Sequence, residues 1–242
     1  MHRPPLPRVC LVLGAALLLL RSAFAADADF QPIFNGRDLG DWEGDMRFWS
    51  VSAGAIRGET TLEHMALSNT FLIWRGGVLK DFELKLKVRI RNGNSGVQYR
   101  SQDRGRHVVA GYQVEVDNAP GKSGFLYHEK GRKFLALVGE KVEIDETQKP
   151  KVVGQLADKK ELIAKGYYKA KDWNDYRIVA RGNHLAHYLN GVQVVDVIDN
   201  DPKGRSLEGI LALQIHAGPP MLVEFKDILL KPLQRIPNQT TP

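Results

Sequence analysis

The stretch GYQVEVDNAP, residues 111–120, places Gln113, Glu115 and Asp117 at alternate positions of an expected strand. Side chains two residues apart in an extended chain point to the same side, and the residues between these three are apolar. Two carboxylates beside an amide can take and give protons, or can hydrogen-bond the hydroxyls of a sugar. The stretch is therefore either a solvated sheet face or the floor of a sugar site, and the remaining strands must decide between the two.

Other expected strands add polar side chains of similar types. The same alternation groups Gln98 with Arg100 in SGVQYR and Gln214 with His216 in EGILALQIH, and HLAHYLNG holds His187 between two leucines. If these strands share one sheet, the groups gather on one face with the two acids, as in a binding or catalytic site. Taken alone, each residue has a commoner structural explanation, such as a surface acid or a hydrogen-bonded buried imidazole.

The elements that must position these residues have the pattern of short β-strands. DFELKLKVRIRNG alternates apolar and charged residues from Phe82 to Arg91, which predicts a half-buried strand. Asn190-Gly191 between HLAHYL and VQVVDV predicts a hairpin, because a tight I′ turn needs positive φ. One short helix is expected in ADKKELIAKG, and the Lys-rich residues 141–170 are expected to form a long surface excursion. The pattern predicts an all-β protein, an antiparallel β-sandwich in one domain.

Residues 1–25 have the composition of a secretory signal peptide. Basic Arg3 and Arg8 precede the apolar run VCLVLGAALLLL, and the segment ends in Ala23-Phe24-Ala25, a small-x-small cleavage site. The run is too short to span a bilayer comfortably. We therefore expect cleavage after residue 25, an exported periplasmic or extracellular chain, and no membrane anchor afterwards. Cys10 leaves with the leader, so the mature domain, residues 26–242, has no cysteine for disulfides or for catalysis.

Composition and motifs exclude several other classes. The whole chain has 34 Lys and Arg against 28 Asp and Glu, and loss of Arg3, Arg8 and Arg21 leaves 31 against 28. Such a small excess does not favour nucleic acid as a partner. The chain has no GxGxxG, GxxxxGK[ST], HExxH or GxSxG motif. A divalent metal ion held by Asp, Glu and His stays open, because no diagnostic spacing decides it.

A conventional glycosidase is disfavoured by the first stretch. Glucanases on a curved sandwich carry Glu-x-Asp-x-x-Glu on one strand, and here Pro120 stands in place of the second glutamate. Glu115 and Asp117 would lie roughly 6.5–7 Å apart along a strand. A retaining pair is separated by about 5–5.5 Å. Retaining hydrolysis from this strand is therefore not expected.

Six segments, in order along the chain, resemble the 3-keto-disaccharide hydrolase domain family: FNGRDLGDW, FELKLKVRIRNGNSGVQYR, GYQVEVD, GFLYHEKGR, DWNDYRIVARGNHLAHYLNG and LALQIHAGPPMLVEFKDILLKPL. The likeness runs from about Phe30 to Leu233. The resemblance implies an exported bacterial protein with a concanavalin A-like jelly-roll β-sandwich. Many relatives carry Glu then Gln where this chain has Gln113 then Glu115, whereas Asp117 fits the family pattern.

The resemblance implies cleavage of 3-keto-disaccharides or 3-keto-glycosides by elimination beside a ketone. A carbonyl at C3 acidifies the C2 proton, so a base can form an enolate, the leaving group on C1 departs, and water adds back. Glu115 or Asp117 is then the base or orients it, a histidine is the alternative base or the acid, and Arg100, Gln214 or a divalent metal holds the enolate oxygen or adjacent hydroxyls.

The candidate residues form two sets. The catalytic candidates are Arg100, Glu115, Asp117, His187 and His216. The substrate-binding candidates are Asn94, Gln98, Gln113, Tyr127, Glu129, Asn190 and Gln214. The alternative is a lectin-like module that holds an oligosaccharide or glycoside on the same face without chemistry.

Overall fold

The computed structural model describes residues 29–234. The chain divides into two compact units, Met1–Gln31 and Pro32–Pro242, and the fold below is that of the second unit by itself. The expected signal peptide, residues 1–25, lies outside the described residues. Strand β1 (Gln31–Pro32) stands at the boundary between the units. Within residues 29–234, no helix is long and apolar enough to cross a membrane.

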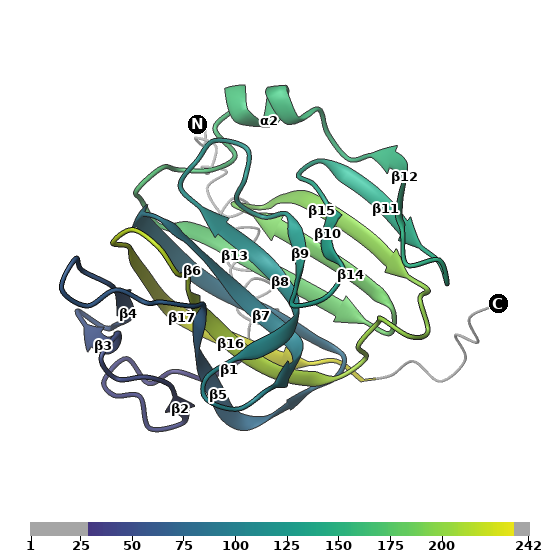
Figure 1. The fold of residues 1–242 in the computed structure, drawn as a ribbon. Helices are drawn as coiled ribbons and strands as arrows, with labels where there is room; N and C mark the ends of the chain where they lie inside the picture. Colours follow the sequence, from purple (N-terminus) through teal and green to yellow (C-terminus); the bar gives the residue numbers. More distant parts are fainter. Residues whose placement is uncertain (1–28, 235–242) are drawn as a thin grey trace, which may run out of the picture. The chain divides into compact units, whose positions relative to one another are not determined.

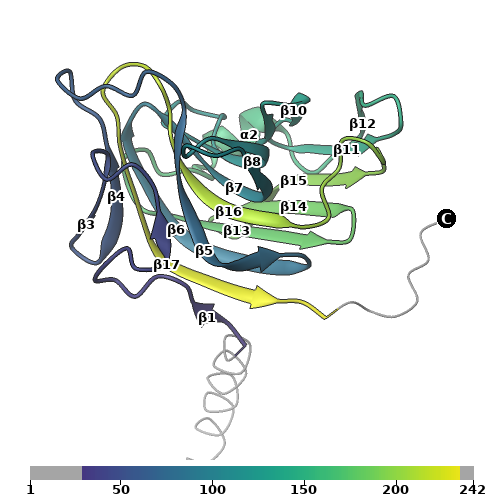
Figure 2. The same ribbon diagram turned by 60° about the horizontal axis from the view of Figure 1, so that its bottom comes forward.

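Two β-sheets pack face to face (Figures 1 and 2). The larger sheet has the order β12-β11-β15-β14-β13-β6-β17-β4-β3, and the seven-stranded sheet has the order β10-β9-β8-β7-β16-β5-β2. The larger sheet contains β3 (Trp49–Ser52), β4 (Ala55–Glu59), β6 (Phe82–Asn92), β11 (Glu140–Ile144), β12 (Pro150–Gln155), β13 (Asn174–Arg181), β14 (His184–Leu189), β15 (Val192–Asp199) and β17 (Leu222–Pro232). The seven-stranded sheet contains β2 (Trp42–Glu43), β5 (Thr70–Leu79), β7 (Asn94–Asp103), β8 (Val109–Asp117), β9 (Leu126–Glu129), β10 (Lys133–Ala136) and β16 (Gly209–Ile215).

The core lies between the sheets and follows from strand alternation. In β6 every second residue from Phe82 to Ile90 is buried, and the charged residues between them are partly exposed. In β8 Tyr112, Val114 and Val116 join the same core from the other sheet. Apart from the parallel pair β11–β15, the neighbouring strands of the two orders are antiparallel. The expected all-β jelly-roll sandwich is confirmed.

Two local predictions are confirmed and one needs correction. Asn190 and Gly191 have φ of 46° and 83° and join β14 to β15, and the short helix is α2 (Lys159–Ala164), which is capped by Asp158. Residues 141–170 are not only a surface excursion. Their first part belongs to β11, which pairs in parallel with β15 and buries Val142 and Ile144.

Candidate functional site

A cavity of about 500 Å³ opens on the face of the seven-stranded sheet that points away from the core. Strands β8, β9 and β16 supply most of its polar lining, and β7 adds Asn94. Eight of the residues singled out from the sequence line it: Asn94, Gln113, Glu115, Asp117, Tyr127, Glu129, Gln214 and His216. The structure therefore brings together the acids, the amides and one histidine, as alternation on a shared face predicts.

Strand register explains why these side chains meet. Gln113 of β8 lies opposite Gln98 of β7 and opposite Tyr127 of β9. Glu115 lies opposite Gly96, and its backbone N–H donates to the Phe125 carbonyl at 3.0 Å. A Cβ at Gly96 would overlap the Gln113 side chain, so the glycine provides the room in which that amide lies.

Glu115 is a nearly buried carboxylate at the floor of the cavity, with 5% of its surface exposed. Asn94 Nδ2 donates to its Oε1, and Gln113 Nε2 donates to its Oε2 at 2.9 Å. The pKa of Glu115 is raised to about 7, mainly by burial. The hydrogen bonds from Asn94 and Gln113 act to lower this pKa, and the charges of Asp117 and Glu129 add to the rise. Near neutral pH this carboxyl group can both take and give a proton.

A chain of hydrogen bonds fixes the amide beside Glu115. Ser101 Oγ donates to Gln98 Oε1 at 2.7 Å, and Gln98 Nε2 donates to Gln113 Oε1 at 2.8 Å. Gln113 must then present its amide nitrogen to Glu115, as observed. Gln98 is fully buried and does not line the cavity. It orients Gln113 instead of contacting a ligand.

Asp117 ends strand β8 and is held by the loop that follows. The Ala119 N–H donates to its Oδ1 at 2.7 Å, and Asn94 Nδ2 donates to its Oδ2 at 3.3 Å. Lys122 Nζ lies 4.0 Å from Oδ2. Asn94 thus bridges Asp117 and Glu115, and the two carboxyl groups lie at the floor of the cavity with one amide between them.

The far side of the cavity is formed by Glu129, Asn69 and His216. Asn69 Nδ2 donates to Glu129 Oε1 at 3.3 Å, and the Ala217 N–H donates to Asn69 Oδ1 at 3.0 Å. His216 is exposed, and its Nδ1 lies 2.6 Å from the Ala217 carbonyl oxygen. Because a carbonyl oxygen only accepts, Nδ1 carries the proton, and Nε2 is directed to other partners.

Arg100 does not line the cavity. A β-bulge between Tyr99 and Gln102 and a φ of 47° at Arg100 break the alternation that would place it beside Gln98. The buried guanidinium contacts the Lys80 carbonyl at 2.6 Å, the Gly182 carbonyl at 2.5 Å and Asp81 Oδ1 at 2.8 Å. It ties two turns together and cannot reach a ligand on the cavity floor.

His187 also lies outside the cavity, because its strand β14 belongs to the larger sheet. Its ring is buried between the sheets, with Nε2 2.8 Å from the Tyr99 hydroxyl and Nδ1 2.9 Å from the Gly124 carbonyl. Burial lowers the pKa of His187 to about 4, so the ring is neutral at neutral pH. The Gly124 N–H donates to the Glu115 carbonyl at 2.9 Å. His187 therefore supports the segment that pairs with Glu115.

Asn190 is a turn residue in the structure. Its Nδ2 donates to the Tyr167 carbonyl at 2.8 Å and to Asn174 Oδ1 at 2.8 Å. It has a positive φ and does not line the cavity. Its side chain stabilises the hairpin and the segment before β13.

The residues present do not fit a metal ion. Across residues 29–234, no group of three or more His, Cys, Asp or Glu side chains is arranged to hold one. Asp117 and Glu115 are bound to amide and backbone donors. We derive no catalytic step through a metal.

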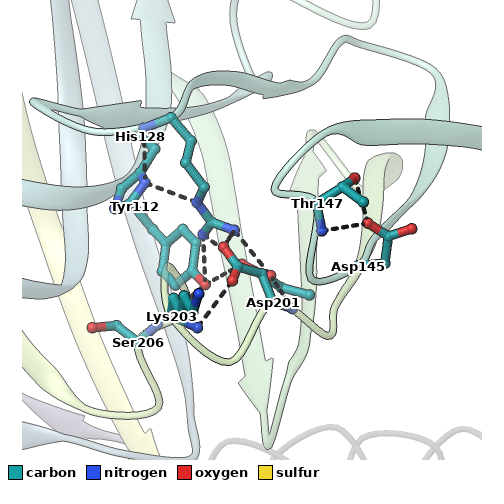
Figure 3. Close-up of polar contacts among 9 residues, drawn as sticks. Tyr112, His128, Asp145, Thr147, Asp201, Lys203 and Ser206 are labelled. Carbon is teal, nitrogen blue, oxygen red and sulfur yellow. Dashed lines mark hydrogen bonds and ion pairs between the residues drawn. The ribbon is translucent and has the colours of Figure 1, made fainter.

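The β9–β10 hairpin, which forms one side of the cavity, is anchored by the partly buried Arg132. Figure 3 shows Tyr112, His128 and Asp201 around this contact. Arg132 contacts Asp199 Oδ2 at 2.6 Å and Asp201 Oδ2 at 3.1 Å. Its N–H and Nε both donate to His128 Nδ1 at 3.2 Å. Burial, with the Arg132 charge, lowers the pKa of His128 to about 4, consistent with a neutral acceptor. Tyr112 donates to the same Asp199 oxygen at 2.5 Å.

Several lining residues were not singled out from the sequence. They are Asn69, Lys122, Phe125, Lys130, Phe134 and Lys159, among others. Phe134 lies opposite Tyr127 in the β9–β10 pair, so the GFLYHEKGRKF hairpin pattern could have revealed it. Asn69 comes from the loop before β5, and no local pattern connects it with Glu129.

The fold and the cavity define an all-β sandwich with an acidic, amide-lined site, and comparison with known proteins identifies the family. Residues 29–231 match the 3-keto-alpha-glucoside-1,2-lyase-like domain, and the chain belongs to this family. The function is therefore carbohydrate-related. No curated protein matches the chain.

Solved structures show the same fold at low identity. A candidate glycosyl hydrolase from Parabacteroides distasonis has a TM-score of 0.55 and 18% identity, over 85% of this chain and 94% of its own. A carbohydrate-binding module from Bacillus subtilis has a TM-score of 0.50 and 15% identity, over 80% and 96%. A Bacillus subtilis protein with a galectin-like fold has a TM-score of 0.55 and 8% identity, over 82% and 92%.

Proposed function

We propose that this protein cleaves the glycosidic bond of 3-keto-glycosides, including 3-keto-disaccharides, by elimination followed by hydration. A base removes the C2 proton, and its electron pair forms an enolate with the C3 carbonyl. The enolate collapses, the C1–O bond breaks, and the leaving oxygen departs with a proton. Water then adds across the C1–C2 double bond, so the net products are the free 3-keto sugar and the alcohol.

Glu115 is the residue that carries the proposal, and we assign it as the base. General-base catalysis is most effective when the pKa of the base lies near the working pH. The raised pKa of about 7 meets this condition, and burial leaves the carboxylate with few water molecules to compete for the substrate proton. Asn94 and Gln113 hold both of its oxygens, which fixes the direction from which a proton is taken.

Donors in the cavity can stabilise the enolate and the leaving group. Gln214 Oε1 accepts from Gln113 Nε2 at 3.5 Å. The amide nitrogen of Gln214 is therefore directed elsewhere, and it can donate to the enolate oxygen or to a sugar hydroxyl. His216, as an imidazolium, can give the leaving oxygen its proton through Nε2. These residues take the roles that sequence reasoning divided between Arg100, Gln214 and the histidines.

The experiment compares a 3-keto-disaccharide with its unoxidised parent, using wild-type protein and the Glu115→Gln variant. We expect the wild type to release the leaving sugar from the keto form only, and the variant to lose turnover while it still binds. Binding of both sugars without release by the wild type would favour a lectin-like module. Release from the unoxidised parent would instead indicate an ordinary glycosidase.

We also propose that residues 1–25 direct export of the chain to the periplasm or beyond. Expression in a bacterial host tests this through the mass of the protein in the periplasmic fraction. A chain beginning at Ala26 is expected, and an uncleaved chain confined to the cytoplasm would contradict the proposal.

A further inference from the structure

The cavity is divided by polarity along the strand register. Gln113 of β8, Tyr127 of β9 and Phe134 of β10 lie in one row across three neighbouring strands. Phe125 lies beside Glu115 in the next row. Neighbouring strands are about 4.8 Å apart, so polar groups at the sheet centre give way to aromatic rings within two strand spacings. We call Phe125, Tyr127 and Phe134 the aromatic wall.

The three rings of the aromatic wall contact one another. The Phe134 ring centroid lies 5.4 Å from that of Phe125 and 5.2 Å from that of Tyr127. Phe134 itself is 57% exposed, and it is the most exposed aromatic side chain among residues 29–234. Leu137, 43% exposed, continues the apolar surface along the cavity. Such an exposed apolar patch inside a polar cavity is typical of a surface that a ligand covers.

The aromatic wall is held in place before any ligand binds. Phe134 follows the turn that Arg132 fixes to Asp199 and Asp201, and Phe125 is buried against the core. A preorganised apolar surface gains more from binding than a mobile one, because less ordering is required.

We propose that the aromatic wall is the subsite for the leaving group, and that it selects an aglycone with a flat, apolar face, such as an aryl group. With the reacting sugar ring over Glu115, a substituent on C1 can extend toward the β10 edge and stack on Phe134. A second hexose would need hydrogen-bond partners for several hydroxyls there, whereas the wall offers ring faces, the Leu137 side chain and few polar groups besides the Tyr127 hydroxyl and Lys130. This inference rests on the proposed function for the direction of the leaving group.

The test compares phenyl and methyl glucosides in two forms. The 3-keto forms report KM and kcat, and the unoxidised forms report binding by calorimetry. Phe134→Ala is compared with Val78→Ala, an exposed apolar residue of β5 outside the cavity. Because Phe134 is largely exposed, the variant should keep its fold, and its melting temperature is measured as the check. Phe134→Leu keeps the apolar character but removes the flat ring.

We expect Phe134→Ala to raise the KM and Kd of the phenyl compounds about tenfold and those of the methyl compounds less than twofold. Phe134→Leu should raise the KM and Kd of the phenyl compounds less than Phe134→Ala does. Val78→Ala should leave the KM and Kd of both compounds unchanged. Ratios of variant to wild type within each substrate cancel the intrinsic reactivity of the phenol leaving group.

An equal loss of affinity for phenyl and methyl compounds in Phe134→Ala would overturn the proposed aryl subsite. Wild-type protein that binds phenyl and methyl glucosides equally, or that prefers a disaccharide, would overturn it as well. If no keto-glycoside is cleaved but Phe134→Ala weakens the binding of phenyl glucoside more than that of methyl glucoside, the aryl subsite stands and the proposed catalysis fails. The two proposals are therefore tested separately.

Discussion

The buried Glu115 makes a prediction that links function to stability. Its pKa is raised from 4.5 to about 7, so the folded protein disfavours the ionised form that the base requires. Below about pH 4.5 the group is protonated in both the folded and the unfolded states, and there is no penalty. As the pH rises to 7, the unfolded state ionises first and the folded protein loses stability, after which the loss is constant.

The size of this loss follows from the shift. One pKa unit corresponds to about 1.4 kcal/mol, so the raised pKa corresponds to about 3 kcal/mol at pH 8. Glu115→Gln removes the ionisation but changes the local hydrogen bonds equally at every pH. The stability of the variant relative to wild type should therefore be about 3 kcal/mol more favourable at pH 8 than at pH 4.

Urea unfolding of both proteins at pH 4 and pH 8 measures this difference. The comparison of variant with wild type is needed because His128 and His187, whose pKa values are lowered to about 4, change the stability in the opposite direction. They are present in both proteins and cancel. The same variant should lose turnover. A pH-dependent difference below about 1 kcal/mol would show that Glu115 ionises normally and would refute its assignment as a base tuned by burial.

Three further predictions concern the same site. The kcat/KM of wild-type protein should rise about tenfold per pH unit toward an apparent pKa near 7, and a profile flat from pH 5 to pH 8 would count against Glu115 as the base. Gly96→Ala should displace the Gln113 amide and lower kcat/KM about 100-fold. Gly154→Ala in β12, where an added Cβ meets only Lys141 at 3.7 Å, should leave kcat/KM unchanged, and kinetics of the two variants decide. His187→Leu should cost about 2–4 kcal/mol in urea unfolding, because the Tyr99 hydroxyl and the Gly124 carbonyl lose their partner inside the core, and a loss below 1 kcal/mol would mean that the link between the sheets is dispensable.

Much of the fold could be predicted from local patterns. The alternation of β6 and the Asn190-Gly191 turn follow directly from side-chain period and from positive φ, and the structure has both. Strand β11 was harder to predict, because its only apolar pattern is Val142 and Ile144 within a Lys-rich segment. It pairs with β15, a strand more than fifty residues away in the sequence.

The candidate site was predictable where alternation holds and not where it fails. Gln113, Glu115 and Asp117 share one face of β8 as the spacing predicts. A β-bulge with a positive φ at Arg100 turns its side chain away from the face of Gln98. At a residue other than glycine, such a bulge has no recognisable sequence signal, so the alternation rule placed Arg100 wrongly. Alternation also cannot say which sheet a strand joins, and for this reason His187 was placed on the wrong face.

The most direct test of the proposed chemistry is hydrogen exchange at C2 of a 3-keto-glycoside in deuterium oxide. Wild-type protein should release the alcohol and leave one deuterium at C2 of the 3-keto sugar, and Glu115→Gln should do neither. Release of the alcohol with the original C2 hydrogen fully retained, and at the same rate when C2 carries deuterium at the start, would contradict the enolate, and with it the role assigned to Glu115.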